Sequence, residues 1–182
     1  ESVRAMQAGQ SSNALTIAAP RDFTAKWLAG RLAIFSKANP ETRFTLVAAD
    51  EDVDFTEANL DLAIRLTTGP GEHEGVRLAA GAYVTVAAPE GGAETPISWP
   101  NCPMVDGVAA LRLADAGLAI EAAAIGLGKA TVPLLLAEAD LASGKVRATD
   151  NARESDDAYW LLAPLPQWRQ KKVKALVEAL TG

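Results

Sequence analysis

The sequence predicts an α/β protein built from two lobes. In the first third of the 182 residues, strand-like and helix-like segments alternate, which is typical of a parallel sheet with helices packed against it. Two apolar strand-like runs, at 81–88 and 158–163, are placed as the natural crossovers between one lobe and the other. The composition of 49% hydrophobic and 22% charged residues indicates an ordered globular chain.

The first lobe follows from local signals. Leu15, Ile17 and Ala19 alternate with smaller or polar residues and predict a strand that stops at Pro20. Apolar side chains at helical spacing then predict a helix with Asp22 as its N-cap. The elements expected here are strand 14–20, a helix ending before 40, strand 43–49, a helical or turn segment at 53–60, and strand 60–66.

The remaining two thirds predict a second set of strands and helices. Asp115 is a good N-cap for a helix that Gly126 ends, and Gly144 ends the next helix. The expected elements are a loop at 67–75, strands at 81–89, near 104–105, at 109–113, 129–132, 145–149 and 158–164, and helices at 116–126, 133–143 and 167–180.

The stretch "IEAAAIGLGKATVP" (120–133) places Gly126 and Gly128 beside Lys129, as a phosphate-binding loop does. A P-loop needs a glycine where Ala123 stands and a serine or threonine where Ala130 stands, so both requirements fail. A dinucleotide fingerprint lies between a strand and a helix, whereas these glycines follow a helix. The stretch is therefore interpreted as a helix end with a tight turn.

Several function classes find no support in the residues. The net charge of −6 and the absence of an apolar run of about 20 residues argue against nucleic-acid wrapping and membrane insertion. His73 is the only histidine and Cys102 the only cysteine, so neither a metal cluster nor a Cys-His dyad is indicated. We expect no metal, no cofactor and no catalysis, and the single thiol is compatible with the cytoplasm.

A binding site is expected at the carboxyl ends of the strands, where open α/β sheets bind ligands. Loops that follow predicted strands, and the start of the helix near 116, supply guanidinium, hydroxyl and backbone N–H groups. These groups suit a small carboxylate or zwitterion. The candidate segments are 20–22, 50–52, 65–68, 115–118 and 131–133.

Several phrases, in order, resemble the effector-binding (substrate-binding) domain of LysR-type transcriptional regulators. "LTIAAPRDFTAKWLAGRLAIFSKANPETRFTL" is similar to the family's opening strand, helix and turn. "DFTEANLDLAIRLTTGPG" is similar to its "D...DLAIR.G.G" phrase, especially in the glycine-cleavage-activator subgroup. "ADAGLAIEAAAIGLGKATVP" and "LASGKVRA" resemble later family phrases. The resemblance covers residues 14–180.

This resemblance implies a fold like the type 2 periplasmic binding proteins, with two Rossmann-like lobes and a small-molecule cleft between them. Lobe I is expected at 14–81 and 164–182, lobe II with its crossover strands at 82–163, and the end of a linker helix or a flexible joint at 1–13. The residues expected to line the cleft are Arg21, Asp22, Phe23, Asp50, Glu51, Arg65, Leu66, Thr67, Tyr83, Asp115, Ala116 and Thr131.

The resemblance also implies a homodimer or homotetramer, with the helix near 22–38 of one copy beside the helix near 117–127 of another. DNA would be bound only through the family's N-terminal helix-turn-helix, which these residues do not include, so a regulatory domain cut from a longer regulator is expected. Arg21-Asp22 stands where the subgroup carries a serine, and Leu66-Thr67 where it carries Tyr-Gly. These departures predict a different effector from that of the best-known members.

Two alternatives stay open at this point. A solute-binding transport protein has a similar fold, and so do some enzymes, such as deaminases and prephenate dehydratase-like proteins. The short chain and the absent signal sequence weigh against transport, and the lack of an acid–base or nucleophile constellation weighs against an enzyme.

Overall fold

The computed structural model describes residues 13–182 except 52, 104–107 and 110. Its contacts divide the chain into two compact units. Unit 1 contains Arg21 and the described residues before it, Leu28–Ala79 and Asp157–Gly182. Unit 2 contains Asp22–Trp27 and Ala80–Asp156. The expected N-terminal joint at 1–13 and the strand expected near 104–105 fall almost wholly outside the described residues.

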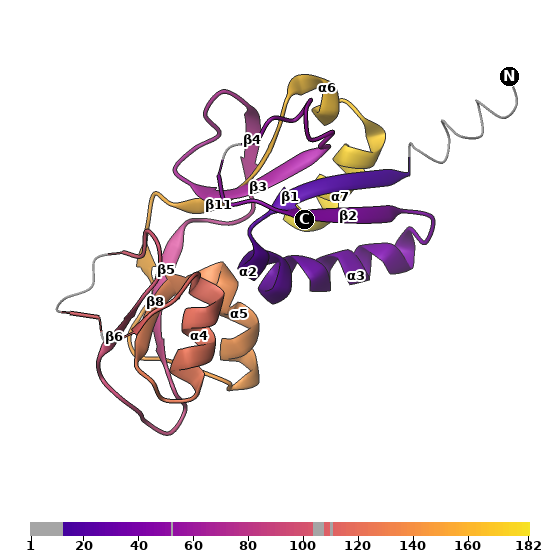
Figure 1. Cartoon of the computed structure of the whole chain (residues 1–182). Coiled ribbons are helices and arrows are strands. Elements are labelled where there is room, and N and C mark those ends of the chain that lie inside the picture. The colour runs from indigo at the N-terminus through magenta and orange to yellow at the C-terminus, as the bar shows by residue number, and fades with distance from the viewer. Residues whose placement is uncertain (1–12, 52, 104–107, 110) are drawn as a thin grey trace, which may run out of the picture. The chain divides into compact units, whose positions relative to one another are not determined.

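Unit 1 is built on one mixed sheet (Figure 1). Parallel pairing of the first three strands agrees with the alternation of strand and helix in the sequence. The C-terminal part of the chain then inserts an antiparallel strand, which pairs with β3 on one side and β4 on the other. The sheet order is β2 (Arg43–Ala48), β1 (Ala14–Ala19), β3 (Leu62–Thr67), β11 (Ala158–Ala163) and β4 (Glu74–Arg77).

The helices of unit 1 bury apolar stripes. In α7 (Lys171–Thr181), Val173, Leu176 and Leu180 recur at helical spacing and are at most 4% exposed. Helix α3 (Ala29–Ala38) contacts α7 and buries Leu32 and Phe35. The single helix expected at 167–180 is instead α6 (Leu165–Trp168) followed by α7. The first of these two helices, α6, contains a proline in its first turn. The second helix, α7, begins after Gln170.

Unit 2 has its own sheet, against which α4 (Ala116–Ala124) and α5 (Leu134–Ser143) lie side by side (Figure 1). Asp115 caps α4 by accepting from the Leu118 N–H at 2.8 Å, and Gly144 ends α5 in the left-handed conformation, as predicted. The strands are β10 (Arg153–Glu154), β5 (Ala82–Ala87), β8 (Lys129–Pro133), β6 (Pro96–Ser98) and β7 (Leu111–Arg112), with β9 (Arg147–Ala148) paired to β5.

The backbone conformation and the close packing of the stretch at 126–128 explain why it contains two glycines. Gly126 has φ of +90°, which favours glycine at the end of a helix. A Cβ on Gly128 would lie 2.5 Å from the Thr95 carbonyl oxygen, because β8 begins directly beside β6 there. The interpretation as a helix end with a tight turn, rather than a phosphate loop, agrees with this geometry.

The structure departs from the expected elements around Asp22. This residue is not an N-cap: α2 (Arg21–Phe23) begins one residue before it, and a π-helical turn, Thr24–Leu28, follows. Because π-helical turns carry one extra residue, they are frequent at functional sites. The contacts of Asp22–Trp27 place this segment with unit 2, although α3 belongs to unit 1.

Two further differences concern the strands. The strand Ala158–Ala163, expected with the second lobe, pairs with β3 and β4 and so lies in the sheet of unit 1. The expected loop at 67–75 ends earlier, because β4 begins at Glu74 and pairs with Ala163.

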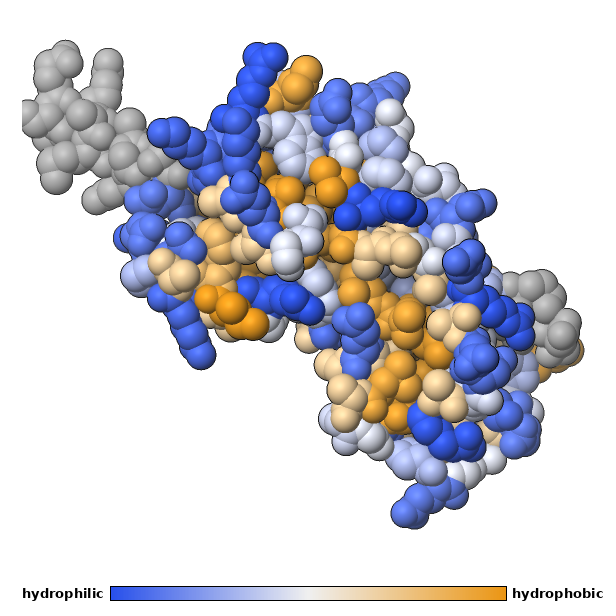
Figure 2. Space-filling model, turned by 180° about the vertical axis from the view of Figure 1, so that it is seen from behind, coloured by the Kyte–Doolittle hydropathy of each residue, from blue (hydrophilic) through white to orange (hydrophobic). Residues whose placement is uncertain are grey.

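Apolar side chains reach the surface among charged ones, seen as orange areas between blue ones in Figure 2. In unit 1 the exposed large apolar residues include Ile34, Leu46 and Val47, and in unit 2 they include Ile125 and Leu127. No helix among the described residues is long and apolar enough to cross a membrane.

Candidate functional site

Unit 1 contains an open pocket of ≈ 870 Å³ that combines charged groups, hydroxyls and one aromatic ring. It is bounded by the turn after β2, the end of β3 and the loop between β3 and β4. The lining residues are Val53, Asp54, Phe55, Thr56, Arg65, Thr67, Thr68, Gly69, Pro70, Gly71, Glu72, His73 and Pro164.

Strand β3 brings Arg65 and Thr67 to this pocket together. Residues two apart on a strand point to the same face, so both side chains face the same way and Leu66, between them, faces the other. Arg65 is half-buried, and its strand is held between β1 and β11. A guanidinium beside hydroxyls, positioned by a central strand, is suited to a carboxylate.

The turn at 53–56 forms the opposite side of the pocket. Asp54 accepts a hydrogen bond from the Glu57 N–H at 2.9 Å, which fixes the turn. Phe55 is buried and meets His73 edge to face, with ring centroids 5.0 Å apart. The only histidine thus lines the pocket, where the sequence indicated merely an exposed loop.

The other expected ligand residues of unit 1 lie elsewhere. Arg21, Asp50 and Glu51 are exposed and are not among the residues that line the pocket. Among the candidates of this unit, Arg65 and Thr67 line the pocket, whereas Leu66 lies between them on β3 with its side chain on the other face.

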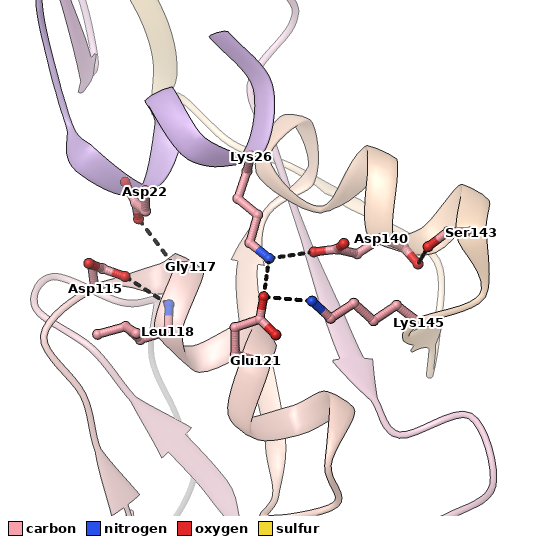
Figure 3. A network of polar contacts seen from close by, with 9 residues as sticks. All are labelled: Asp22, Lys26, Asp115, Gly117, Leu118, Glu121, Asp140, Ser143 and Lys145. Atoms are coloured by element: carbon pink, nitrogen blue, oxygen red, sulfur yellow. Dashed lines mark hydrogen bonds and ion pairs between the residues drawn. The ribbon is translucent and has the colours of Figure 1, made fainter. Parts of the chain in front are cut away.

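In unit 2, four expected residues meet at the N-terminus of α4. Asp115 caps the helix and Ala116 begins it. Asp22 approaches from the separate segment 22–27 (Figure 3), and Phe23 follows it in that segment. The Gly117 N–H donates to Asp22 Oδ2 at 3.2 Å, and the Phe23 N–H donates to Asp22 Oδ1 at 2.8 Å. The two α4 N–H groups of Gly117 and Leu118 are thus bonded to two carboxylates of the chain itself.

Tyr83 and Thr131, the other candidates of unit 2, lie on neighbouring strands. Thr131 and Thr85 share a hydroxyl hydrogen bond of 2.8 Å. The Trp99 Nε1–H donates to the Thr131 carbonyl at 2.9 Å, and its ring stacks against Tyr83 at 6.5 Å. Sequence reasoning missed Trp99, for which the only signal was a tryptophan at the end of the polar run "ETPISWP".

A charged network on the π-helical turn was also missed. Lys26 Nζ lies 2.7 Å from Glu121 Oε1 on α4 and 2.8 Å from Asp140 Oδ2 on α5 (Figure 3). Lys145 Nζ lies 2.6 Å from the same Glu121 oxygen. The partners of Lys26 are 95 and 114 residues away in sequence, so no local pattern could reveal them.

The pKa values of this network are shifted by its own charges. Burial lowers the pKa of Lys26, but hydrogen bonds and the charges of Asp140 and Glu121 outweigh it, and the pKa is raised overall. Hydrogen bonds from Lys145 and Lys26 lower the pKa of Glu121. Lys26 and Glu121 therefore carry opposite charges at neutral pH, and the ion pairs of Lys26 hold segment 22–27 against α4 and α5.

The described part of the chain contains no group of three or more His, Cys, Asp or Glu side chains that could hold a metal ion. The polar groups instead line an open pocket in unit 1 and form a closed hydrogen-bonded helix end in unit 2. Two α/β units, each built on one mixed sheet, are the architecture of the type 2 periplasmic-binding-protein class.

Comparison with known proteins identifies the family. Residues 8–105 match the LysR substrate binding domain, and the chain belongs to this family. The AhcY transcriptional activator HvrB of Rhodobacter capsulatus is 38% identical over 87 residues, which are 47% of this chain and 30% of the relative. The matched part thus spans less than a third of that relative's length.

Solved structures agree in fold. The effector domain of the regulator AmpR of Pseudomonas aeruginosa superimposes with a TM-score of 0.70 at 22% identity, covering 91% of this chain and 97% of that domain. The regulatory domain of CrgA, a LysR-type regulator of Neisseria meningitidis, gives 0.74 at 13% identity, covering 92% and 97%. Full-length AphB of Vibrio cholerae gives 0.73 at 11% identity, covering 100% and 73%.

These findings confirm the predicted fold class and the reading as a LysR effector-binding domain. The family consists of the sensing domains of regulators, so the expectation that the chain is not an enzyme is also confirmed. The glycine-cleavage-activator subgroup is not distinguished by them.

The Lys26 network generates a prediction about stability. Replacing Lys26 by methionine leaves Asp140, which is 13% exposed, without this partner, and should lower the free energy of unfolding by about 1–3 kcal/mol. The exposed Lys37 of α3 is the matched control, and Lys37→Met should change the free energy of unfolding by less than about 0.5 kcal/mol. Urea unfolding at pH 7 measures both.

The pH dependence follows from the lowered pKa of Glu121. A carboxyl with a depressed pKa in the folded state stabilises the fold above its unfolded pKa, and this stabilisation is lost as the pH falls through the folded pKa. The decrease in the free energy of unfolding caused by Lys26→Met should therefore become smaller when the pH falls below the ordinary pKa of glutamate. If Lys26→Met lowered the free energy of unfolding equally at pH 7 and in acid, a charge-based role of Lys26 would be contradicted.

Proposed function

We propose that this chain is the effector-sensing part of a LysR-type transcriptional regulator and binds a small carboxylate or amino-acid-like molecule. The observation that carries the proposal is the pocket of unit 1, in which β3 presents Arg65 and Thr67 within a LysR substrate binding domain. An arginine guanidinium binds a carboxylate through two parallel hydrogen bonds, and threonine hydroxyls add directional contacts.

Family membership favours this function over the two alternatives. A transport receptor or an enzyme of similar fold would be expected to match its own family, whereas the matched model is that of regulators. The placement of the effector between the lobes, and the contributions of the other candidate residues, stay predictions. The likeness to the glycine-cleavage-activator subgroup rests on the "DLAIRLTTGPG" phrase, and we retain it as a proposal.

Coupling to transcription would follow the thermodynamics of linked equilibria. A ligand shifts a regulator between two states only as far as its affinities for those states differ. In the proposed arrangement the regulator is cytoplasmic, and a helix-turn-helix elsewhere in it binds DNA. Ligand binding to this chain changes the equilibrium between the two states of the regulator.

The ligand proposal is tested by thermal-shift screening of amino acids and small carboxylates. At least one compound should raise the melting temperature, because a ligand that binds only the folded state stabilises it by mass action. Arg65→Met should weaken binding about tenfold or more, since a charge-assisted bidentate contact is lost. Thr67→Val removes one hydroxyl at nearly constant volume and should have a smaller effect in the same direction.

The matched control is Thr45→Val, at an exposed position of β2 outside the pocket. It should leave the ligand-induced shift unchanged. Circular dichroism and urea unfolding of each variant separate loss of binding from loss of folding. A ligand that stabilises Arg65→Met as strongly as the unmodified chain would show that the pocket is wrongly placed.

We also propose a homodimer in which α3 of one copy lies beside α4 of the other. The support is the pair of apolar surfaces on or next to these elements: Ile34 is 67% exposed and Ile125 is 76% exposed. Large exposed apolar side chains of this kind mark protein interfaces when they gather on one element.

Sedimentation velocity tests the dimer. Ile34→Lys and Ile125→Lys should each shift the chain toward monomer, because a charge buried in an apolar interface lacks a partner. Val76→Lys, at an exposed apolar position of β4, is the control and should leave the dimer intact. A monomeric chain at every accessible concentration, or dimers that tolerate both changes, would contradict the arrangement.

A further inference from the structure

The N-terminus of α4 already holds an anion that belongs to the protein. The first N–H groups of a helix lack intrahelical partners and carry partial positive charge, so they attract anions. In this chain the Leu118 N–H donates to Asp115 of the same helix, and the Gly117 N–H donates to Asp22 from segment 22–27. The contact with Asp22 joins residues 95 apart in sequence.

Close packing makes room for this second carboxylate. A Cβ added to Gly117 would lie 2.6 Å from the Asp22 Cβ and 3.5 Å from its Cα, which is too close for any other residue without movement. Ala116 and Gly117 are buried, and Asp22 is half-buried. Glycine at the second position of α4 therefore lets the backbone of segment 22–27 come against the helix end.

Segment 22–27 is held in place at its other end as well. Lys26 binds Glu121 on α4 and Asp140 on α5 (Figure 3). Phe23 stacks on Trp27 with ring centroids 5.2 Å apart. Asp22 and Lys26 are four residues apart. The negatively charged Asp22 contacts the start of α4, and the positively charged Lys26 contacts its middle. The position of the Asp22 carboxylate is thus fixed by contacts on both sides.

We infer that Asp22 is a specificity-determining residue: its carboxylate supplies the anion for the α4 N-terminus and thereby excludes the carboxylate of an effector from that position. An incoming anion would have to displace Asp22 and would also meet the charge of Asp115 nearby. A group that binds at this helix end must instead be a hydrogen-bond donor or a cation.

This inference deepens the proposed function, because it states that the α4 N-terminus of unit 2 does not bind the carboxylate of an effector. It rests on that function for its biological meaning. Its test, however, uses a simple anion and a backbone reporter, so it fails or succeeds independently of whether an effector is found.

The experiment is an NMR titration of ¹⁵N-labelled protein with sodium acetate at constant ionic strength and pH 7. The amide resonances of Gly117 and Leu118 report binding at the helix end. In the unmodified chain acetate should cause no saturable shift of either resonance. In Asp22→Ser the Gly117 N–H becomes accessible, and acetate should bind there at least about tenfold more tightly than to the unmodified chain.

Two further variants keep the test decisive. Asp22→Asn preserves the shape and an oxygen for Gly117 but removes the charge, so acetate affinity should lie between those of the unmodified chain and Asp22→Ser. It also provides a folded sample if the serine variant unfolds. Asp156→Ser removes an exposed carboxylate elsewhere in unit 2 and controls for net charge, so it should match the unmodified chain.

A saturable acetate shift at Gly117 in the unmodified chain as strong as in Asp22→Ser would overturn the inference. Equal acetate responses of both Asp22 variants and Asp156→Ser would overturn it too, because Asp22 would then not be the group that closes the helix end. Neither result would affect the screening test of the Arg65 pocket.

Discussion

The contact between the Asp22 carboxylate and the first turn of α4 is the constraint on which much of the second unit depends. Helix N–H groups without partners must find acceptors, and here two carboxylates of the chain provide them. This requirement explains why Gly117 has no side chain, and why segment 22–27 groups with unit 2 although the rest of its helix does not. Lys26 fixes the same segment through α4 and α5.

The polar groups of the two units differ in charge and in accessibility. In unit 1, the central strand β3 presents a cationic and hydroxyl-bearing face toward an open pocket, which suits an anion. In unit 2, the corresponding attractive position, a helix N-terminus, is already neutralised from within.

The sequence predicted those features that depend on neighbouring residues. The strands around Ile17 and Ile64, the cap at Asp115 and the helix end at Gly144 each follow from a local pattern, and the structure has them. Short strands such as β6 and β10 have too few residues to show an alternation. The Lys26 network and the role of Asp22 could not be predicted from the sequence, because their partners are about a hundred residues away. Its position just before an apolar helical pattern predicted that Asp22 caps the following helix. In the structure Asp22 instead accepts a hydrogen bond from the distant Gly117 N–H.

The most direct test of this account is a crystal structure of the chain with a carboxylate or amino-acid ligand that stabilises it. The account predicts the ligand carboxylate within hydrogen-bond distance of the Arg65 guanidinium and the Thr67 hydroxyl, with Asp22 still accepting from the Gly117 N–H. A ligand carboxylate bound to the Gly117 and Leu118 N–H groups, with Asp22 turned away, would contradict it.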